Sequence, residues 1–173
     1  MSYKSETQKK NLAWFLPRPK KDHYKGGMPL YCEEWLLELA KDILGNPEPT
    51  MLNLFCGMNK FGFRIDIKPE VEPDLVCDAH SFASKVNSQY DVILADPPYS
   101  NQEAKDLYGT PKLNYSIWSK ECIKVLAPKG LLIVFHKHIK PNPNPEIFTV
   151  VKRVFVGNRS NHLLRAAIFF QRK

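Results

Sequence analysis

The stretch Tyr90–Gln102, "YDVILADPPYSNQ", carries an acid and an aromatic residue on either side of two prolines. An apolar run leads into Asp96, Pro97 and Pro98 follow it, and Tyr99 completes the tetrapeptide. Each proline fixes its φ angle at about −65°, so this segment is stiff. A carboxylate and an aromatic face that are held rigidly can act on a ligand as a hydrogen-bond acceptor and a stacking surface. The same four residues can also simply end a strand, and the neighbouring segments decide between these interpretations.

Three earlier segments that predict strands also end in residues suited to a binding site. "TMLNLFCG" ends with Phe55 and Gly57 in its last three residues, "FRIDI" contains Asp66, and "DLVCDA" contains Asp78. In open parallel sheets, ligands bind at the carboxyl ends of the strands. Glycine or aspartate at four successive strand ends therefore predicts a ligand site rather than a decorated surface.

The elements that must position these residues follow from the apolar pattern. A helix is expected in "PLYCEEWLLELAKDIL" and another in "YSIWSKECIKV", the second followed by a turn at "LAPKG". Further strands are expected in "YDVILAD", in "LLIVFHKH" and in two runs of the last 26 residues, with "GNRSN" as the turn between them. The segment of residues 101–115 is expected to be a loop. Continuous apolar runs indicate strands covered on both faces, which predicts an α/β fold with a mostly parallel twisted sheet and a C-terminal β-hairpin.

The segments "LNLFCG", "RIDI", "CDAH" and "DVILADPPY", in that order, resemble the class I S-adenosylmethionine-dependent methyltransferases. More narrowly, they are similar to the amino-methyltransferases of nucleic acids that carry a D/N-P-P-Y/F/W tetrapeptide. The resemblance covers roughly residues 25–170 and implies a Rossmann-like fold with S-adenosylmethionine as the cofactor. It divides the chain into a basic N-terminal arm, residues 1–27, and a single methyltransferase domain, residues 28–173.

The resemblance also implies a chemistry for the tetrapeptide. The exocyclic amine of a base is a poor nucleophile, because its lone pair is delocalised into the ring. The carboxylate of Asp96 and the carbonyl of Pro97 would accept the two amine hydrogens, and Pro97 and Pro98 would hold both acceptors in place. The ring of Tyr99, rather than its hydroxyl, would stack on the base. No metal is required, and His136 and His138 lack a third ligand, so a structural or substrate-contacting role is expected for them.

The cofactor-binding residues are implied by position in the same family. Asp66 would bind the ribose hydroxyls of S-adenosylmethionine, and Asp78 would accept a hydrogen bond from the adenine amine. The methionine end would be bordered by Phe55 and Gly57 and, on a weaker match in "KGGMPLYCEEWL", by Met28 and Pro29.

Two departures from the family pattern concern the glycine loop. Asn59 stands where a second glycine is usual, and only nine positions separate Gly57 from Asp66, where about 20 are usual. The helices that normally connect these strands cannot fit, so some helices on one face should be shortened or lost. That loss would leave a surface for a partner subunit.

The net charge of +7 is concentrated at the two ends of the chain. Basic ends suggest a polyanionic partner, although a basic surface that only keeps the protein soluble fits the charge equally well. In the arm, the aromatic Trp14 and the cations Lys20 and Lys21 suit contact with nucleic acid, and docking of the arm onto the domain suits them as well. Tyr108, after the tetrapeptide, is a further candidate contact.

The lengths of the connecting segments restrict the possible modes of substrate recognition. Only 17 residues separate Asp78 from Asp96, and one hairpin follows the catalytic segments, so no separate recognition domain is expected. A partner subunit or a homodimer could then supply target recognition. We favour adenine N6 in DNA, where a full D-P-P-Y is commonest. RNA, at guanine N2 or adenine N6, is the alternative, as is a catalytically decayed nucleic-acid-binding subunit. Protein glutamine methylation is disfavoured, because those enzymes usually carry Asn in place of Asp96.

The remaining sequence features bear on location. The four cysteines are scattered without metal or disulfide spacing, and no apolar run approaches the roughly 20 residues of a membrane span. The N-terminus has no apolar segment of the kind that a secretory signal needs. A cytoplasmic protein with no membrane partner is expected.

Overall fold

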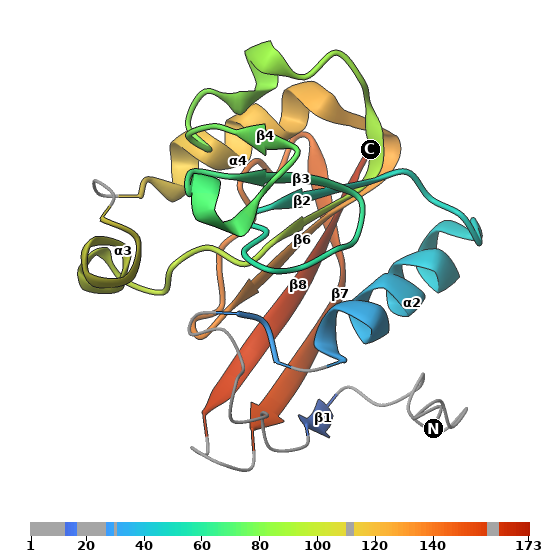
Figure 1. Cartoon of the computed structure of the whole chain (residues 1–173). Helices are drawn as coiled ribbons and strands as arrows, with labels where there is room; N and C mark the ends of the chain where they lie inside the picture. Colours follow the sequence, from blue (N-terminus) through green and yellow to red (C-terminus); the bar gives the residue numbers. More distant parts are fainter. Residues whose placement is uncertain (1–12, 17–26, 30, 110–112, 159–162) are drawn as a thin grey trace.

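The computed structural model describes residues 13–16, 27–29, 31–109, 113–158 and 163–173. Eight strands form one sheet in the order β1-β7-β8-β6-β5-β2-β3-β4 (Figure 1). The strands are β1 (Ala13–Leu16), β2 (Met51–Leu54), β3 (Phe63–Asp66), β4 (Leu75–Val76), β5 (Tyr90–Ala95), β6 (Leu126–His136), β7 (Phe148–Asn158) and β8 (Leu164–Arg172). The helices are α2 (Cys32–Leu44), α3 (Asn101–Tyr108) and α4 (Tyr115–Val125), with short 3₁₀ turns at Pro69–Val71 and Phe82–Lys85. None of these described helices is long and apolar enough to span a membrane.

The strand directions confirm the expected α/β architecture. Strands β6, β5, β2, β3 and β4 run parallel to one another, whereas β8 runs antiparallel to both β6 and β7. Because β8 is antiparallel, it begins at the edge of the sheet where the parallel strands end. The register shows this directly, since Ala166 pairs with His136, the last residue of β6.

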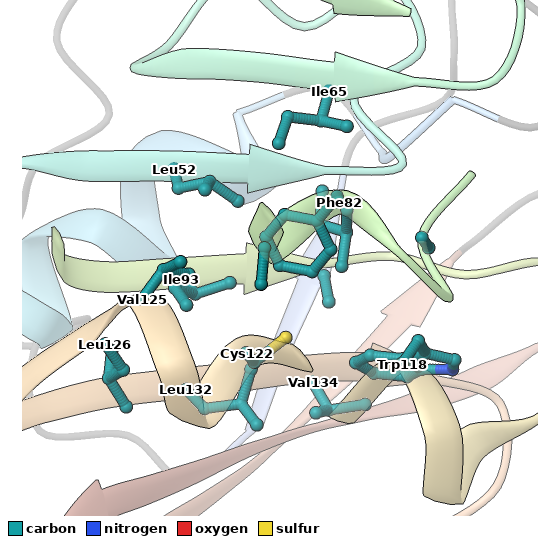
Figure 2. Close-up of a cluster of buried hydrophobic side chains, with 14 of the residues drawn as sticks. Leu52, Ile65, Phe82, Ile93, Trp118, Cys122, Val125, Leu126, Leu132 and Val134 are labelled. Atoms are coloured by element: carbon teal, nitrogen blue, oxygen red, sulfur yellow. The ribbon is translucent and has the colours of Figure 1, made fainter. Parts of the chain in front are cut away.

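Both faces of the central strands are buried, which explains their continuous apolar sequences. Successive residues of β5 alternate between two cores: Ile93 packs with α4, and Val92 packs with α2. In the α4 core, Trp118 and Cys122 of that helix lie against side chains of the central strands and against Phe82 of the second 3₁₀ turn (Figure 2). The two cores therefore hold the central strands between one helix on each face.

The connections between β2, β3 and β4 are short, as the residue spacing predicted. Residues 55–62 join the parallel strands β2 and β3 without a helix, and a single 3₁₀ turn lies between β3 and β4. Gly62 is required in the first connection because its φ is +67° and a Cβ there would lie 2.4 Å from the Met51 carbonyl oxygen. The expectation of helices shortened or lost is confirmed.

The segment after the tetrapeptide differs from the loop that the sequence predicted. Residues 101–108 form α3, whose N-cap is Ser100. The Ser100 hydroxyl accepts a hydrogen bond from the Glu103 N–H at 3.1 Å. This pairing of Ser100 with Glu103 is part of a capping box, a signature that is present in the sequence.

Strand β6 also begins earlier than expected, at Leu126 instead of Leu131. The segment predicted as a turn is a bulge within this strand: Tyr90 pairs with Leu126 but Val92 pairs with Leu131. Lys129 takes a positive φ of 63° in this bulge, and the strand resumes pairing after it.

Part of the predicted N-terminal arm belongs to the sheet. Residues Ala13–Leu16 form β1, which pairs in parallel with β7 from Phe155 to Asn158. These four residues therefore dock onto the domain through their backbone, and contact of Trp14 with nucleic acid stays a prediction.

Candidate active site

The strand register brings the predicted site residues to one edge of the sheet. Leu54 at the end of β2 pairs with Ala95 of β5 on one side and with Ile65 of β3 on the other. The residues that follow these three are Phe55, Asp96 and Asp66. They therefore emerge next to one another from three neighbouring strands, because paired residues of parallel strands lead in the same direction.

The tetrapeptide folds so that its two functional ends are in contact. The Tyr99 hydroxyl donates a hydrogen bond to the carboxylate of Asp96. The backbone N–H of Tyr99 donates to a carboxylate oxygen of Glu103 at 2.5 Å. The first turn of α3 thus anchors Tyr99, and Tyr99 in turn contacts Asp96. The sequence pattern indicated a role for the Tyr99 ring only, and the structure gives its hydroxyl a partner.

The ring of Tyr99 is bordered by residues from β6 and β8. The His136 ring meets it edge-on, with the ring centroids 5.0 Å apart. The Cζ atom of Arg165 lies 5.4 Å from the Tyr99 ring centroid, and the Nζ atom of Lys137 lies 5.9 Å from it. Base stacking on Tyr99 stays a prediction, and any base would meet a ring that already contacts two cations.

The charge of Asp96 is set by opposing influences. Burial raises the pKa of Asp96 to about 8, and Glu33 and Glu103 act in the same direction. The guanidinium of Arg165 and the hydrogen bond from Tyr99 both act to lower that pKa. The free protein therefore holds a proton on Asp96 at neutral pH, and a cation bound nearby would favour its release.

Glu33, in the first turn of α2, is a second carboxyl of this kind. Burial raises the pKa of Glu33 to about 7, and the neighbouring Glu34 adds to that effect. Two carboxyls, Asp96 and Glu33, thus retain protons near neutral pH in the absence of a ligand. A cationic ligand would be stabilised where both can ionise.

Sequence reasoning missed Glu33 and Arg165 as site residues. Nothing in "CEEWLL" distinguishes Glu33 from Glu34 before the helix is placed. For Arg165 a signal exists, because the first residues of an antiparallel last strand must lie at the edge where the parallel strands end. Arg165 has two buried nitrogens, Nε and Nη1, without a hydrogen-bond partner among the described residues.

The glycine loop and Asp66 form the second half of the site. One carboxylate oxygen of Asp66 accepts a hydrogen bond from the Gly57 N–H at 2.9 Å, and the other accepts from the Lys68 N–H at 3.0 Å. Phe55 and Gly57 both have positive φ, 63° and 50°, so the chain turns sharply as it leaves β2. Asp66 thereby ties the end of β3 to the loop that follows β2.

Phe55 and Asn59 stabilise the same loop. The Phe55 ring packs edge-on against Trp118, with the centroids 5.5 Å apart. The side-chain oxygen of Asn59 accepts a hydrogen bond from the Phe61 N–H at 3.0 Å. The residue that replaces the usual second glycine therefore closes a turn of its own.

Asp78 lies in a chain of hydrogen bonds beside the loop. Its carboxylate accepts from the His80 N–H and lies 2.9 Å from His80 Nδ1. His80 Nε2 accepts from the Asn114 N–H at 2.9 Å. His80 is therefore the tautomer with its proton on Nδ1, and Asp78 is linked through it to the start of α4. The side chain of Asp78 is 42% exposed, so it stays accessible to a ligand.

The remaining predicted residues are less closely tied to this edge. Met28 is buried with residues of α2, and the Pro29 carbonyl accepts from the Cys32 N–H at 2.9 Å at the start of that helix. The backbone of Trp14 pairs with Val156 in the sheet. Tyr108 is the last residue of α3, and Lys20 and Lys21 lie outside the described residues.

His136 and His138 make a local structural contact. The Nδ1 atom of His136 accepts from the His138 N–H at 2.9 Å, and His136 is buried. Burial and the positive charges of Lys140 and Lys137 lower the pKa of His136 to about 3, and His138 acts in the same direction. His136 is therefore neutral. Within the described part of the chain, no group of three or more His, Cys, Asp or Glu could hold a metal ion.

Comparison with known proteins finds similar structures but no similar sequences. Neither protein-family models nor the sequences of curated proteins match the chain. Among solved structures, the chain is similar to the N-methyltransferase NodS from Bradyrhizobium japonicum WM9 in complex with S-adenosyl-L-homocysteine. The TM-score is 0.61 with 16% sequence identity, over 96% of this chain and 97% of NodS.

Two further structures show the same likeness. TrmN from Thermus thermophilus gives a TM-score of 0.53 at 16% identity, over 78% of this chain and 48% of TrmN. The Burkholderia thailandensis 1,6-didemethyltoxoflavin-N1-methyltransferase gives 0.53 at 12% identity, over 79% of this chain and 76% of that one. With the strand order and directions described above, these likenesses show that the chain has the Rossmann-like fold of the class I methyltransferases.

Proposed function

We propose that this protein transfers a methyl group from S-adenosylmethionine to an exocyclic amino group of a nucleic-acid base, with adenine N6 in DNA as the favoured target. One observation carries the proposal. Asp96–Tyr99 leaves β5 directly beside the Gly57 loop and Asp66, at the carboxyl edge of a sheet with a methyltransferase fold. This proximity supports a methyl-acceptor site next to a cofactor site.

The residues on the cofactor side fit S-adenosylmethionine. When bound, this cofactor supplies an electrophilic methyl group on a cationic sulfur. Asp66 would hold the ribose hydroxyls, because each of its oxygens accepts one backbone N–H and keeps further acceptor capacity. Asp78 would hold the adenine amine, and Phe55 and Gly57 would border the methionine end.

The protonated state of the free site supports a cationic ligand. Asp96 and Glu33 have raised pKa values in the absence of a ligand, and a nearby positive charge favours ionisation of both. Cofactor binding would then release a proton from Asp96. The carboxylate formed in this way is the species that can accept the amine hydrogens.

The acceptor side derives its chemistry from Asp96. The Asp96 carboxylate and the Pro97 carbonyl accept the two amine hydrogens, which localises the nitrogen lone pair for attack on the methyl carbon. As the nitrogen–carbon bond forms, the carbon–sulfur bond breaks, and its electron pair stays on the sulfur. The nitrogen becomes positively charged, and Asp96 takes the surplus proton. A pKa near neutrality suits a group that must be ionised first and protonated afterwards.

The choice of substrate rests on the tetrapeptide and the charge distribution. A full D-P-P-Y is commonest in adenine-specific enzymes that act on DNA, and the basic ends of the chain suit a polyanion. Two of the similar structures are N-methyltransferases by name, which supports a nitrogen acceptor. RNA methylation at adenine N6 or guanine N2 is the second candidate, since the same tetrapeptide serves it.

The test measures methyl transfer to each base. The protein is incubated with labelled S-adenosylmethionine and separate pools of unmethylated DNA and RNA, which are then digested to nucleosides and separated by mass. We expect label in N6-methyl-2′-deoxyadenosine from the DNA pool and none with the Asp96→Ala variant. Label in the RNA pool alone would move the target to RNA. Cofactor binding without label in either pool would contradict the proposal.

A further inference from the structure

The segment that follows β6 places two lysines beside two aromatic rings. The Nζ atom of Lys137 lies 5.9 Å from the ring centroid of Tyr99, and the Nζ atom of Lys140 lies 5.6 Å from that of Tyr115. The Tyr115 hydroxyl donates to the carbonyl of Pro141 at 2.7 Å, which holds α4 against the end of this segment. Ile139, between the lysines, is 61% exposed, so the segment is open to solvent.

Neither lysine has an acidic partner among the described residues. The ion pairs found there are Lys41–Glu38, Arg64–Asp74, His80–Asp78 and Lys124–Glu121. Lys140 is partly buried, and burial lowers its pKa. A partly desolvated ammonium group without a carboxylate is costly, and an anionic ligand would relieve that cost.

The positive charges of this segment all influence the side chain of His136. His136, which directly precedes this segment, has a pKa that burial lowers, and Lys140, His138 and Lys137 act in the same direction. Arg165 adds a further cation near the same site, with its Cζ atom 5.4 Å from the Tyr99 ring centroid. Tyr99 and His136 therefore lie close to several positive charges, whereas Asp96, which Tyr99 contacts, is an acidic residue.

We propose that Lys137 and Lys140 bind backbone phosphates of the nucleic-acid strand that carries the target base. These phosphates would flank the base that enters the Asp96 site. This inference rests on the proposed function and names the contact that would present the base. Proteins that bind single-stranded nucleic acid combine cations, which contact the phosphates, with aromatic rings, which stack on the bases. The lysines and aromatic rings of this segment have that arrangement. A repeated anion also fits two separate ammonium groups better than a single small anion does.

The test is the salt dependence of binding. A fluorescein-labelled 12-nucleotide single-stranded DNA with one central adenine is titrated with the protein, and anisotropy is followed from 50 to 200 mM NaCl. Each phosphate neutralised on a single strand contributes about 0.7 to the slope of log affinity against log salt. The affinity of the parent protein should therefore fall about sevenfold more over this range than that of the variant Lys137→Gln/Lys140→Gln.

A matched control removes the same charge elsewhere. Lys120 on α4 and Lys129 in the β6 bulge are both exposed, and the double variant Lys120→Gln/Lys129→Gln should keep the parent slope. Equal slopes for the parent and the Lys137→Gln/Lys140→Gln variant would overturn the inference. So would an equal loss of slope in both double variants, because that would indicate net charge alone.

Two further measurements complete the test. The first shows whether the two lysines bind phosphate groups, and the second distinguishes failure of this inference from failure of the proposed function. Sodium phosphate that displaces the oligonucleotide more strongly than sodium chloride of equal ionic strength would indicate a site for phosphate groups, and would support the inference if the Lys137→Gln/Lys140→Gln variant loses that difference. The same difference in the variant would place the phosphate site elsewhere and would contradict the inference. Methyl transfer by the parent protein with unchanged slopes would leave the proposed function intact and remove this inference. Slopes that differ as expected, without methyl transfer, would support the strand contact and contradict the activity.

Discussion

At the scale of single residues, the raised pKa of Asp96 should make the stability of the protein depend on pH. Its pKa in the folded protein is about 8, whereas an unfolded chain releases this proton at about pH 4. Between these values the folded state binds a proton that the unfolded state does not. The contribution of Asp96 to stability is therefore present at low pH and decreases as pH rises through that window.

The variant Asp96→Asn should remove this dependence. Its free energy of unfolding should lose a pH-dependent contribution of up to about 1.4 kcal/mol per pH unit between pH 5 and 8. Urea unfolding of both proteins across this range measures the difference. Turnover of the variant should fall at least about a hundredfold, because an amide cannot take the amine proton. Parallel stability curves for the two proteins would show that Asp96 is already ionised in the folded state.

Arg165 should determine where the acidic limb of the activity profile lies. Its guanidinium lowers the pKa of Asp96, so Arg165→Met should raise that pKa and move the rise of turnover to higher pH. Arg165→Lys should restore part of the shift, because it keeps the charge. Turnover is measured from pH 6 to 9.5 with saturating substrates. Arg153→Met, an exposed position on β7, is the control and should leave the profile unchanged.

At the scale of secondary-structure elements, α3 acts as the support for the tetrapeptide. Its capping residue Ser100 directly follows Tyr99, and its first turn supplies the Glu103 carboxylate that holds the Tyr99 N–H. The helix thus couples its own N-terminus to the ring that borders the acceptor site.

Ser100→Ala should loosen this support. Loss of the cap should lower the free energy of unfolding by about 1 kcal/mol and raise the apparent Michaelis constant for nucleic acid, because Tyr99 is held less firmly. Denaturant unfolding and steady-state kinetics measure the two effects. Ser116→Ala, at an exposed position in the first turn of α4, should change neither. An unchanged Michaelis constant with the expected loss of stability would limit α3 to a structural role.

Elements were predictable from the sequence where burial on both faces left a continuous apolar run. Strands β2, β5 and the apolar half of β6 are of this kind, and the short distance from Gly57 to Asp66 already excluded a helix between β2 and β3. The helix α3 was missed because its polar composition hid the Ser100 and Glu103 signature. The early start of β6 was missed because "APKG" has the composition of a turn, and only pairing with β5 keeps it in the strand.

The site was predictable only in the part that lies on parallel strands. Asp66 and Asp96 could be placed because each follows a strand in a sheet whose carboxyl edge binds ligands. Glu33 could not be placed, because its proximity to Asp96 depends on the side of the sheet that α2 covers, and Arg165 could be placed only once β8 was known to run antiparallel to its neighbours. Those are properties of the folded chain and not of any local segment.

At the scale of the whole molecule, the N-terminal region contains both a group of positive charges and a strand of the sheet. Residues 1–11 carry Lys4, Lys9 and Lys10, whereas residues 13–16 form the edge strand β1 against β7. Truncations at two points can therefore separate the two contributions.

Deletion of residues 1–11 should weaken binding to DNA and flatten its salt dependence, without a change in thermal stability, because β1 remains. Deletion of residues 1–24 should also lower the melting temperature, because the pairing of β1 with β7 is lost. Anisotropy titrations and thermal unfolding measure the two effects. Identical melting temperatures for the two truncated proteins would show that β1 contributes nothing to stability.

The short connection between β2 and β3 has a kinetic consequence. The Gly57–Asp66 contact closes over only nine residues, whereas Arg165 meets Tyr99 from the opposite end of the chain. Loop-closure entropy is small for the first contact and must be overcome by the assembled sheet for the second. We expect the cofactor half of the site to organise early in refolding and the acceptor half to form last, once the terminal hairpin has docked. A newly synthesised chain would then form its binding site for the methyl donor before it forms the site that holds the methyl acceptor.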